Sequence, residues 1–226
     1  MWITLVLGGV FVVVMTYLAS EVYEGVTEDD GLAGLDHPLL AWVMSWRSGA
    51  LNTAITWFTH TGGTIGMPII AILAIITLTY RSRSWRPFLL IASSALGSLA
   101  MTIAGKNLFG RARPDRADAI PPYETSPSFP SGHTLNATAI IAVIAYLWFL
   151  ELEKRMARAW MIAGSAAYVV LIGLSRVYLG HHWLTDVAAA WMLGLMWAAL
   201  VVLAHRVFHT VRRVRRDRQA GNAPTA

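Results

Sequence analysis

The residues best suited to chemistry in this sequence lie in three short segments, and the richest of them is SRVYLGHHWLTD at 175–186. Asp186 follows His182 by four residues, a spacing that puts two side chains on one face of a helix. A carboxylate there can accept a hydrogen bond from one imidazole nitrogen and leave the lone pair of the other nitrogen free to attack an electrophile. The spacing therefore nominates His182 as a nucleophile, and we expect His181 to point to solvent or to a neighbouring helix.

The second segment, KNLFGRARP at 106–114, supplies cations. Lys106 and Arg113 are seven residues apart, and Pro114 disfavours helix at Arg113, so we expect that guanidinium in a loop. Snorkelling to the membrane interface explains any one such cation. It explains less well why five cations lie near one membrane face: Lys106, Arg111, Arg113, Arg116 and Arg176.

The third segment, SFPSGHT at 128–134, indicates the start of a helix. Ser131 is a candidate N-cap, Gly132 allows close approach of the backbone, and the free N–H groups of a helix N-terminus suit an anion. His133 adds a titratable imidazole beside that anion site, which is what a general acid requires.

Two other interpretations of these polar residues remain open. Imidazoles and a carboxylate from His133, His181, His182 and Asp186 suit zinc or iron, but the surrounding cations favour an anion over a metal ion. A purely structural polar network is the other alternative, although each ion buried in a bilayer costs about 2.5–3.5 kcal/mol on insertion scales.

The elements that must position these residues are transmembrane helices. Hydrophobic residues make up 56% of the 226, only 14% are charged, and cysteine is absent, which rules out thiolate chemistry and disulfides. Because about 20 apolar residues span a bilayer, we predict an all-α, polytopic bundle of six transmembrane helices. The predicted spans are 2–20, 61–80, 87–105, 134–150, 159–175 and 183–204.

The distribution of basic residues predicts the orientation of the bundle. Twelve of the 18 lysines and arginines lie in 81–86, 151–158 and 206–218, whereas the connection 21–48 has six acids against one arginine. By the positive-inside rule, both termini are cytoplasmic and the three polar segments meet at the extracytoplasmic face of the cell membrane. The basic tail suits anionic lipid, and we expect no nucleic-acid partner.

A single membrane domain is predicted over 1–205, followed by a basic cytoplasmic tail at 206–226. Its outward loop, 21–60, contains HPLLAWVMSWR at 37–47, which resembles an interfacial helix with Trp42 and Trp46 at headgroup level. Plain anchoring of the loop to the membrane explains the same segment equally well.

KNLFGRARP, PSGH and SRVYLGHHWLTD together resemble the three signature motifs of the type 2 phosphatidic acid phosphatase superfamily. Every motif position matches in order, and the resemblance extends over six spans and nearly the whole chain. The superfamily also includes soluble vanadium-dependent haloperoxidases, which this membrane chain does not resemble in composition.

The resemblance implies a role for each matching residue. The family's nucleophile matches His182, the carboxylate that orients it matches Asp186, and the acid that protonates the leaving oxygen matches His133. The residues implied to bind the phosphate oxygens are Lys106, Arg113, Ser131, Gly132 and Arg176. Arg111 and Arg116 lie outside the pattern and are expected at most to guide the headgroup.

The implied function is a lipid phosphatase that needs no metal or other cofactor. The expected partner is a lipid phosphate or diphosphate, with undecaprenyl diphosphate favoured, and phosphatidate and phosphatidylglycerol phosphate as alternatives. A lipid phosphotransferase, or a protein that binds lipid phosphates without catalysis, remains open as well.

Overall fold

A computed structural model of the chain describes residues 2–28 and 30–221, and this part contains helices and loops but no strand. The six long helices are α1 (Trp2–Glu28), α4 (Gly66–Ser82), α5 (Arg86–Phe109), α6 (Gly132–Glu151), α7 (Arg155–Tyr178) and α8 (Leu184–Gly221). The short helices are η1 (Gly31–Leu35), α2 (Asp36–Met44), α3 (Gly49–His60) and η2 (Arg116–Asp118). The predicted all-α class is confirmed.

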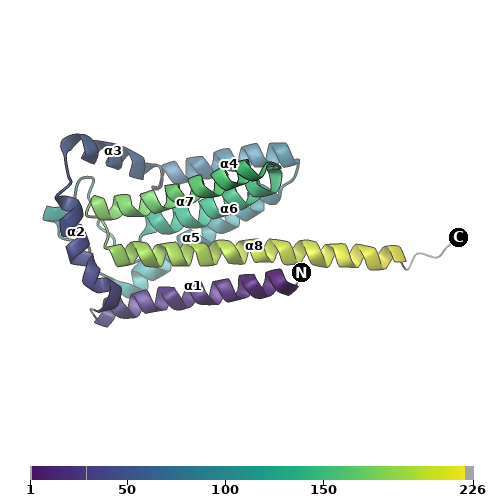
Figure 1. The fold of residues 1–226 in the computed structure, drawn as a ribbon, viewed down its shortest axis with the longest axis horizontal. Coiled ribbons are helices and arrows are strands. Elements are labelled where there is room, and N and C mark those ends of the chain that lie inside the picture. Colours follow the sequence, from purple (N-terminus) through teal and green to yellow (C-terminus); the bar gives the residue numbers. More distant parts are fainter. Residues whose placement is uncertain (1, 29, 222–226) are drawn as a thin grey trace.

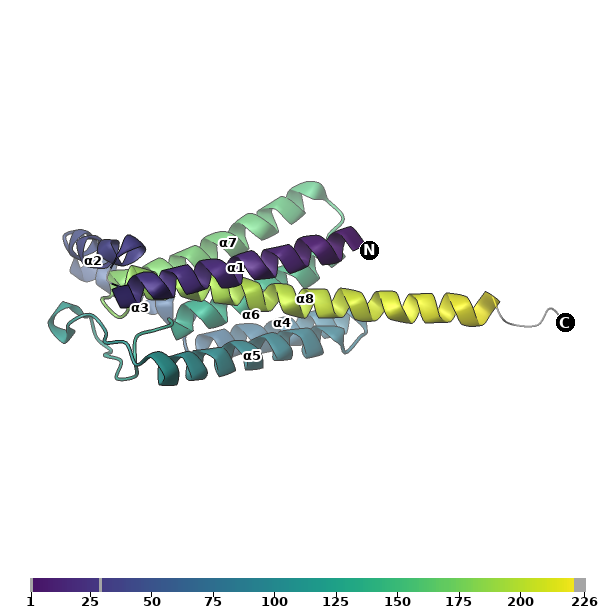
Figure 2. The same ribbon diagram turned by 90° about the horizontal axis from the view of Figure 1, so that it is seen from below.

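Helix α6 is the centre of the bundle. It packs against α4, α5, α7 and α8, while α1 lies along α8 (Figures 1 and 2). Leu135, Ala139 and Val143 recur every four residues on α6 and are fully buried, as expected for one face of a helix surrounded by others. The central position of α6 fixes the place of its N-terminus, which carries the PSGH motif.

The outer surface of the bundle is apolar. On α1, α4, α5 and α7, large aliphatic and aromatic side chains are widely exposed, including Val13, Ile76, Leu96 and Trp160. A soluble monomer does not expose contiguous apolar surface on this scale, whereas a bilayer covers it favourably.

Five helices in the described part are long and apolar enough to cross a membrane: α1, α5, α6, α7 and α8. Each contains or closely matches a predicted span. The span predicted at 61–80 corresponds to α4, which is apolar but has only 17 residues because 61–65 form a turn before it. A count of six spans therefore stays a prediction.

The three motif segments lie together at one end of the bundle, with α2, α3 and the loop 110–131 (Figure 1). The start of α1 and the end of α8 lie toward the opposite end, where the α4–α5 and α6–α7 connections are also found (Figures 1 and 2). This arrangement agrees with the alternation from which the orientation was predicted, but the membrane side of each end stays a prediction. Helix α8 continues through residue 206 without a break, and residues 222–226 of the predicted tail lie outside the described residues.

Helix α2 corresponds to the predicted interfacial segment at 37–47 but ends at Met44. Trp42 and Trp46 are exposed, with ring centroids 5.3 Å apart. The segment after α2 is tied to the bundle by Arg47, which donates to the carbonyls of Tyr178 (2.6 Å) and Asp118 (2.7 Å). The segment after α2 is thus hydrogen-bonded both to the end of α7 and to η2.

Candidate active site

The three motifs converge because α5 ends, α6 begins, and α7 gives way to α8 at the same end of the bundle. Gly110 ends α5 in the left-handed conformation, which glycine adopts at little cost, so Arg113 lies in a loop as predicted. The preceding turn packs closely on the PSGH segment, since a Cβ on Gly105 would lie 2.6 Å from Cδ of Pro130. This close approach sets the cationic segment beside the start of α6.

The two ring nitrogens of His182 face groups of opposite charge. Nδ1 lies 3.4 Å from Oδ2 of Asp186, and Nε2 lies 3.1 Å from Nη1 of Arg113. A guanidinium can only donate, so Nε2 must accept and Nδ1 must carry the proton. His182 is therefore held in the tautomer that presents a lone pair toward the arginine.

The pairing of His182 with Asp186 is as predicted, but its geometry differs from the prediction. Helix α8 begins at Leu184, two residues after His182, so the two side chains do not stack on one helix face. Instead, Oδ2 of Asp186 also accepts from the backbone N–H of Trp183 (2.9 Å), which turns the carboxylate back toward His182. The carboxylate, which lies in the first turn of α8, thus bonds back to the residue before the helix, as in a capping box.

Glu124, which belongs to none of the three motifs, lies between the cations of the site. Its Oε2 accepts from Nη2 of Arg113 (2.8 Å), its Oε1 accepts from Nη2 of Arg176, and Nδ1 of His133 is 3.9 Å from Oε1. Lys106 donates to Ser126 Oγ (3.0 Å) close by. A single carboxylate therefore contacts two of the three candidate phosphate-binding cations.

The electrostatics of the loop residues follow from burial and these neighbours. Burial would raise the pKa of the Glu124 carboxyl, but Arg176 and the other positive charges outweigh it and lower that pKa to about 2. Burial, followed by the charges of Arg113 and Arg176, holds the pKa of His182 well below its ordinary value. At neutral pH Glu124 is thus ionised and His182 is neutral, the form in which a histidine is nucleophilic.

Arg176 is almost completely enclosed, with a side chain that is 2% exposed. Besides Glu124 it donates to Thr59 Oγ1 (3.3 Å), and its Nε is buried without a hydrogen-bond partner in the described residues. A buried guanidinium N–H without an acceptor is costly, so this group is suited to bind a further anionic oxygen.

The start of α6 fits the prediction in part. Ser131 is the N-cap residue of α6, but its hydroxyl bonds to Thr134 Oγ1 (2.9 Å) and caps no backbone N–H. Gly132 begins the helix, and His133 follows under the turn before α4, where a Cβ on Gly63 would lie 2.9 Å from Nε2 of His133. The turn over 61–65 therefore fixes the place of the candidate acid.

His181 does not face solvent, which was one of the two directions expected for it. The residue is 3% exposed, and its Nε2 is 2.7 Å from the carbonyl oxygen of Ile120. Burial first, and the charge of Arg176 second, lower the pKa of His181 to about 4. His181 thus ties the loop after η2 to the segment before α8.

Arg111 also differs from what was expected, because it does not reach outward toward a headgroup. Its guanidinium bonds to Asp186 Oδ1 (2.6 Å) and to Asp36 Oδ2 (2.8 Å). Ser128, which the motifs did not indicate either, donates to Oδ2 of Asp186.

One signal in the sequence could have indicated Glu124, since it is the only acidic residue from 119 to 131.

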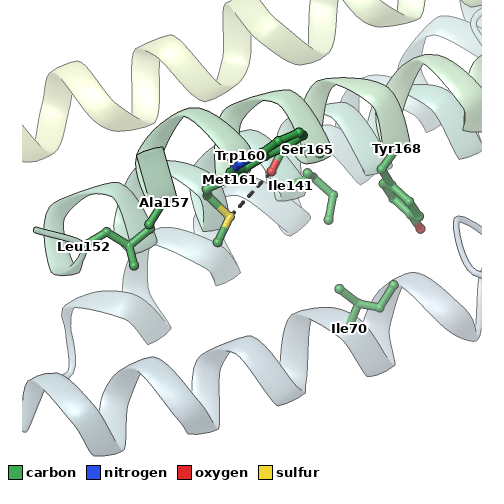
Figure 3. A pocket seen from close by; sticks show the side chains of 9 residues that line it. Ile70, Ile141, Leu152, Ala157, Trp160, Met161, Ser165 and Tyr168 are labelled. Carbon is green, nitrogen blue, oxygen red and sulfur yellow. Dashed lines mark hydrogen bonds between the residues drawn. The ribbon is translucent and has the colours of Figure 1, made fainter. Parts of the chain in front are cut away.

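The structure has a polar cavity at the candidate site and an apolar cavity farther along the bundle. A polar cavity of about 660 Å³ opens at the loops, and its lining includes Arg111, Arg113, Arg116, Glu124, Ser126 and His181. An apolar cavity of about 670 Å³ lies between α4, α6 and α7, where Ile70, Ile141, Trp160 and Met161 line it (Figure 3). At one end of this cavity, the hydroxyl of Tyr168 bonds to Thr61 Oγ1 (2.9 Å) in the turn that covers His133.

Comparison with known proteins identifies the family. The family model described as PAP2 superfamily matches residues 85–209, which include all three motifs. The chain belongs to the PAP2 superfamily. As a member of this superfamily with several apolar membrane-length helices, it is a multi-pass membrane lipid phosphatase, a hydrolase of phosphoester bonds.

Two related sequences and one solved structure show how far the likeness extends. Phosphatidylglycerophosphatase B of Bacillus subtilis is 39% identical over 69% of this chain and 75% of its own length. Decaprenylphosphoryl-5-phosphoribose phosphatase of Mycobacterium tuberculosis is 32% identical over 69% of this chain and 80% of its own length. The crystal structure of a transmembrane PAP2-type phosphatidylglycerolphosphate phosphatase from Bacillus subtilis superposes with a TM-score of 0.71 at 27% identity, covering 86% of this chain and 93% of that one.

Proposed function

We propose that the chain removes the terminal phosphate of a membrane lipid through a phosphohistidine formed on His182. The observation that carries this proposal is the position of the His182 ring, with Nδ1 toward Asp186 and Nε2 toward Arg113. The lone pair on Nε2 points to the place where a phosphoryl group bound by Arg113 would lie. Asp186 in turn stabilises the positive charge that develops on the ring during attack.

In the first step Nε2 of His182 attacks phosphorus, a nitrogen–phosphorus bond forms, and the bond from phosphorus to the leaving oxygen breaks. His133 gives its proton to that oxygen, so the lipid product leaves as a neutral alcohol or as a monophosphate. In the second step water attacks phosphorus, His133 takes a proton from the water, and inorganic phosphate leaves with His182 restored.

Phosphoryl transfer spreads negative charge over the equatorial oxygens, so fixed donors supply much of the catalysis. Arg113, Arg176 and Lys106 provide three positive charges, and the start of α6 at Ser131 and Gly132 provides backbone N–H groups. This arrangement supports a reaction in which protein cations take the part that Mg²⁺ takes in other phosphoryl transfers.

Hydrolysis is favoured over the two alternatives for this site. A phosphotransferase would need an acceptor alcohol near His182, and the polar cavity that opens at His181 and Arg113 instead gives water access to the loops. A protein that only binds lipid phosphates would not need His182 held in its nucleophilic tautomer. The distribution of basic residues supports a reaction at the extracytoplasmic face.

For the substrate, we propose phosphatidylglycerol phosphate first. The phosphatidylglycerol phosphate phosphatase activity named for Bacillus subtilis supports it, through a sequence match at 39% identity and a structural match. The apolar cavity beside the turn at Thr61 has room for part of one hydrocarbon chain of such a lipid. Undecaprenyl diphosphate, favoured from the sequence, is the second candidate, and the relative named for a decaprenylphosphoryl substrate supports a polyprenyl lipid as the substrate class.

Phosphate release from a panel of lipids tests this proposal. The purified protein in detergent with EDTA is given phosphatidylglycerol phosphate, phosphatidate and undecaprenyl diphosphate, with and without added lipid alcohols. We expect phosphate release from phosphatidylglycerol phosphate at the highest kcat/KM and without an acceptor. Dependence on an added acceptor would indicate a transferase, and a higher kcat/KM for undecaprenyl diphosphate would favour the second substrate.

A further inference from the structure

Arg111 lies between two buried carboxylates from distant parts of the chain. Its Nη2 is 2.8 Å from Oδ2 of Asp36, and its Nη1 is 2.6 Å from Oδ1 of Asp186 and 2.7 Å from Oγ1 of Thr185. The carboxylate side chains of Asp36 and Asp186 are 3% and 0% exposed. Buried ions in direct contact interact far more strongly than surface pairs, so this arrangement is not an ordinary surface salt bridge.

Asp36 also holds the first turn of α8. Its Oδ1 accepts from the backbone N–H of Thr185 (2.9 Å), and its Oδ2 accepts from the hydroxyl of Thr185 (2.6 Å). The first N–H groups of a helix have no partner within the helix, and a carboxylate at this end is favoured by the helix dipole. Helix α2, which carries Asp36, is thereby fixed to the turn of α8 that carries Asp186.

The two oxygens of Asp186 have separate partners. Oδ1 bonds to Arg111, whereas Oδ2 bonds to Ser128 and the N–H of Trp183 and faces Nδ1 of His182. Rotation of the carboxylate about its own bond would break both sets at once. Arg111 therefore determines which oxygen of Asp186 faces His182 and in what orientation.

From these contacts we propose that Arg111 and Asp36 are positioning residues for the nucleophile and act through Asp186. Arg111 keeps Asp186 ionised and oriented. Asp36 neutralises part of the positive charge of Arg111, so that the negative charge of Asp186 still acts on His182. The three side chains together carry one net negative charge, which is the charge that stabilises the imidazolium formed on attack. This inference rests on the proposed phosphohistidine chemistry.

The proposal predicts how the variants combine. Removal of Arg111 alone leaves two buried carboxylates without their shared cation. Removal of Asp36 alone leaves Asp186 as the one carboxylate that neutralises Arg111, so less of its negative charge acts on His182. Removal of both returns the net charge to that of Asp186 alone. The double variant Asp36→Asn/Arg111→Gln should therefore be more active than Arg111→Gln, which two independent structural losses would not produce.

The experiment is a single-turnover measurement with enzyme in excess over phosphatidylglycerol phosphate, in which release of the dephosphorylated lipid reports the first step. The rate constant describes only the folded, active molecules, so a loss of folded protein does not lower it. The variants are Arg111→Gln, Arg111→Lys, Asp36→Asn and the double variant, with Asp115→Asn as a control in an exposed carboxylate of the same loop. Inhibition by orthovanadate measures the binding of anion separately.

We expect Arg111→Gln to lower the rate constant about 10- to 100-fold, the range found when a group that orients a metal-ligating side chain is lost. Arg111→Lys should lose less, the double variant should recover about 5-fold or more over Arg111→Gln, and vanadate inhibition should change by less than about 3-fold. If Arg111→Gln does not fold, Asp36→Asn and Arg111→Lys must still lower the rate constant with vanadate inhibition unchanged.

Three results would overturn the inference: an unchanged rate constant, additive losses in the double variant, or parallel losses of rate and vanadate binding, which would mean that Arg111 binds the phosphate itself. Failure of the proposed function looks different. In that case the wild-type protein would release no dephosphorylated lipid, or would do so with no phosphohistidine on His182.

Discussion

Arg113 donates toward Nε2 of His182 at 3.1 Å, so a cation and a neutral histidine face one another across a short contact. Arg113 also bonds to Glu124 (2.8 Å), and Glu124 bonds to Arg176. Two of the groups proposed to bind phosphate, Arg113 and Arg176, are thus already bonded to a carboxylate of this chain. A substrate phosphate must compete with Glu124 for the same N–H groups.

Glu124→Gln should therefore strengthen the binding of anions. The substitution removes a negative charge next to the phosphate position and frees the guanidinium groups of Arg113 and Arg176. We expect orthovanadate to inhibit the variant about 5- to 20-fold more tightly, which corresponds to an interaction of about 1–2 kcal/mol. Vanadate titration of the hydrolysis rate checks this. Asp115→Asn, which removes an exposed charge in the same loop, should leave inhibition unchanged, and weaker inhibition of Glu124→Gln would show that Glu124 supports the anion site.

Gly63→Ala should impair protonation of the leaving oxygen. A Cβ on Gly63 would lie 2.9 Å from Nε2 of His133, so either the histidine or the turn at 61–65 must shift. We expect kcat to fall about 10-fold for a lipid alkoxide leaving group and much less for p-nitrophenyl phosphate, whose leaving group needs no acid. Gly49→Ala, which would meet no atom within 4 Å, is the control. An equal loss for both substrates would argue against His133 as the acid.

The stability of the protein should fall in mild acid because of its buried histidines. The pKa of His181 is lowered to about 4 in the fold, against about 6.5 in an unfolded chain. The unfolded state thus binds more protons between these values, and the free energy of unfolding decreases as the pH falls from about 6.5 to 4, by about 2–3 kcal/mol for this residue. Thermal unfolding in detergent over this range should show a shallower pH dependence for His181→Gln than for the wild type. An identical slope would mean that His181 titrates normally.

Chelation of metal ions should not reduce activity. The cations of the proposed site are Lys106, Arg113 and Arg176, and they stabilise the same charge that a metal ion would. We expect phosphate release to persist in EDTA and to be inhibited by orthovanadate, which resembles the trigonal-bipyramidal transition state. Loss of activity in EDTA and its recovery with added zinc would restore the metal-site interpretation of the histidines.

Sequence patterns predicted the class of the fold and many of the residues that meet at the candidate site, because both depend on local signals. Apolar length indicated the membrane helices, and Pro114 correctly indicated that Arg113 lies in a loop. The spacing of His182 and Asp186 identified the right pair for an incorrect reason, because α8 starts only after His182. A backbone N–H, not a helix face, brings the two side chains together.

The remaining parts of the site depend on contacts between distant segments. Arg111 meets Asp36 and Asp186 across 75 residues in each direction, and no spacing rule indicates such pairs. Glu124 joins Arg176 across 52 residues, in a loop without periodicity. These contacts exist only because the bundle brings the ends of α2, α5, α7 and α8 to one place.

The most direct test of the account is to trap the phosphoenzyme with substrate labelled on its terminal phosphate and to map the labelled residue under alkaline conditions, where phosphohistidine survives. We predict label on His182 in the wild type, no label in His182→Ala, and retained label in His181→Ala. Label on His181, or full phosphate release by His182→Ala, would contradict the assignment of His182 as the nucleophile.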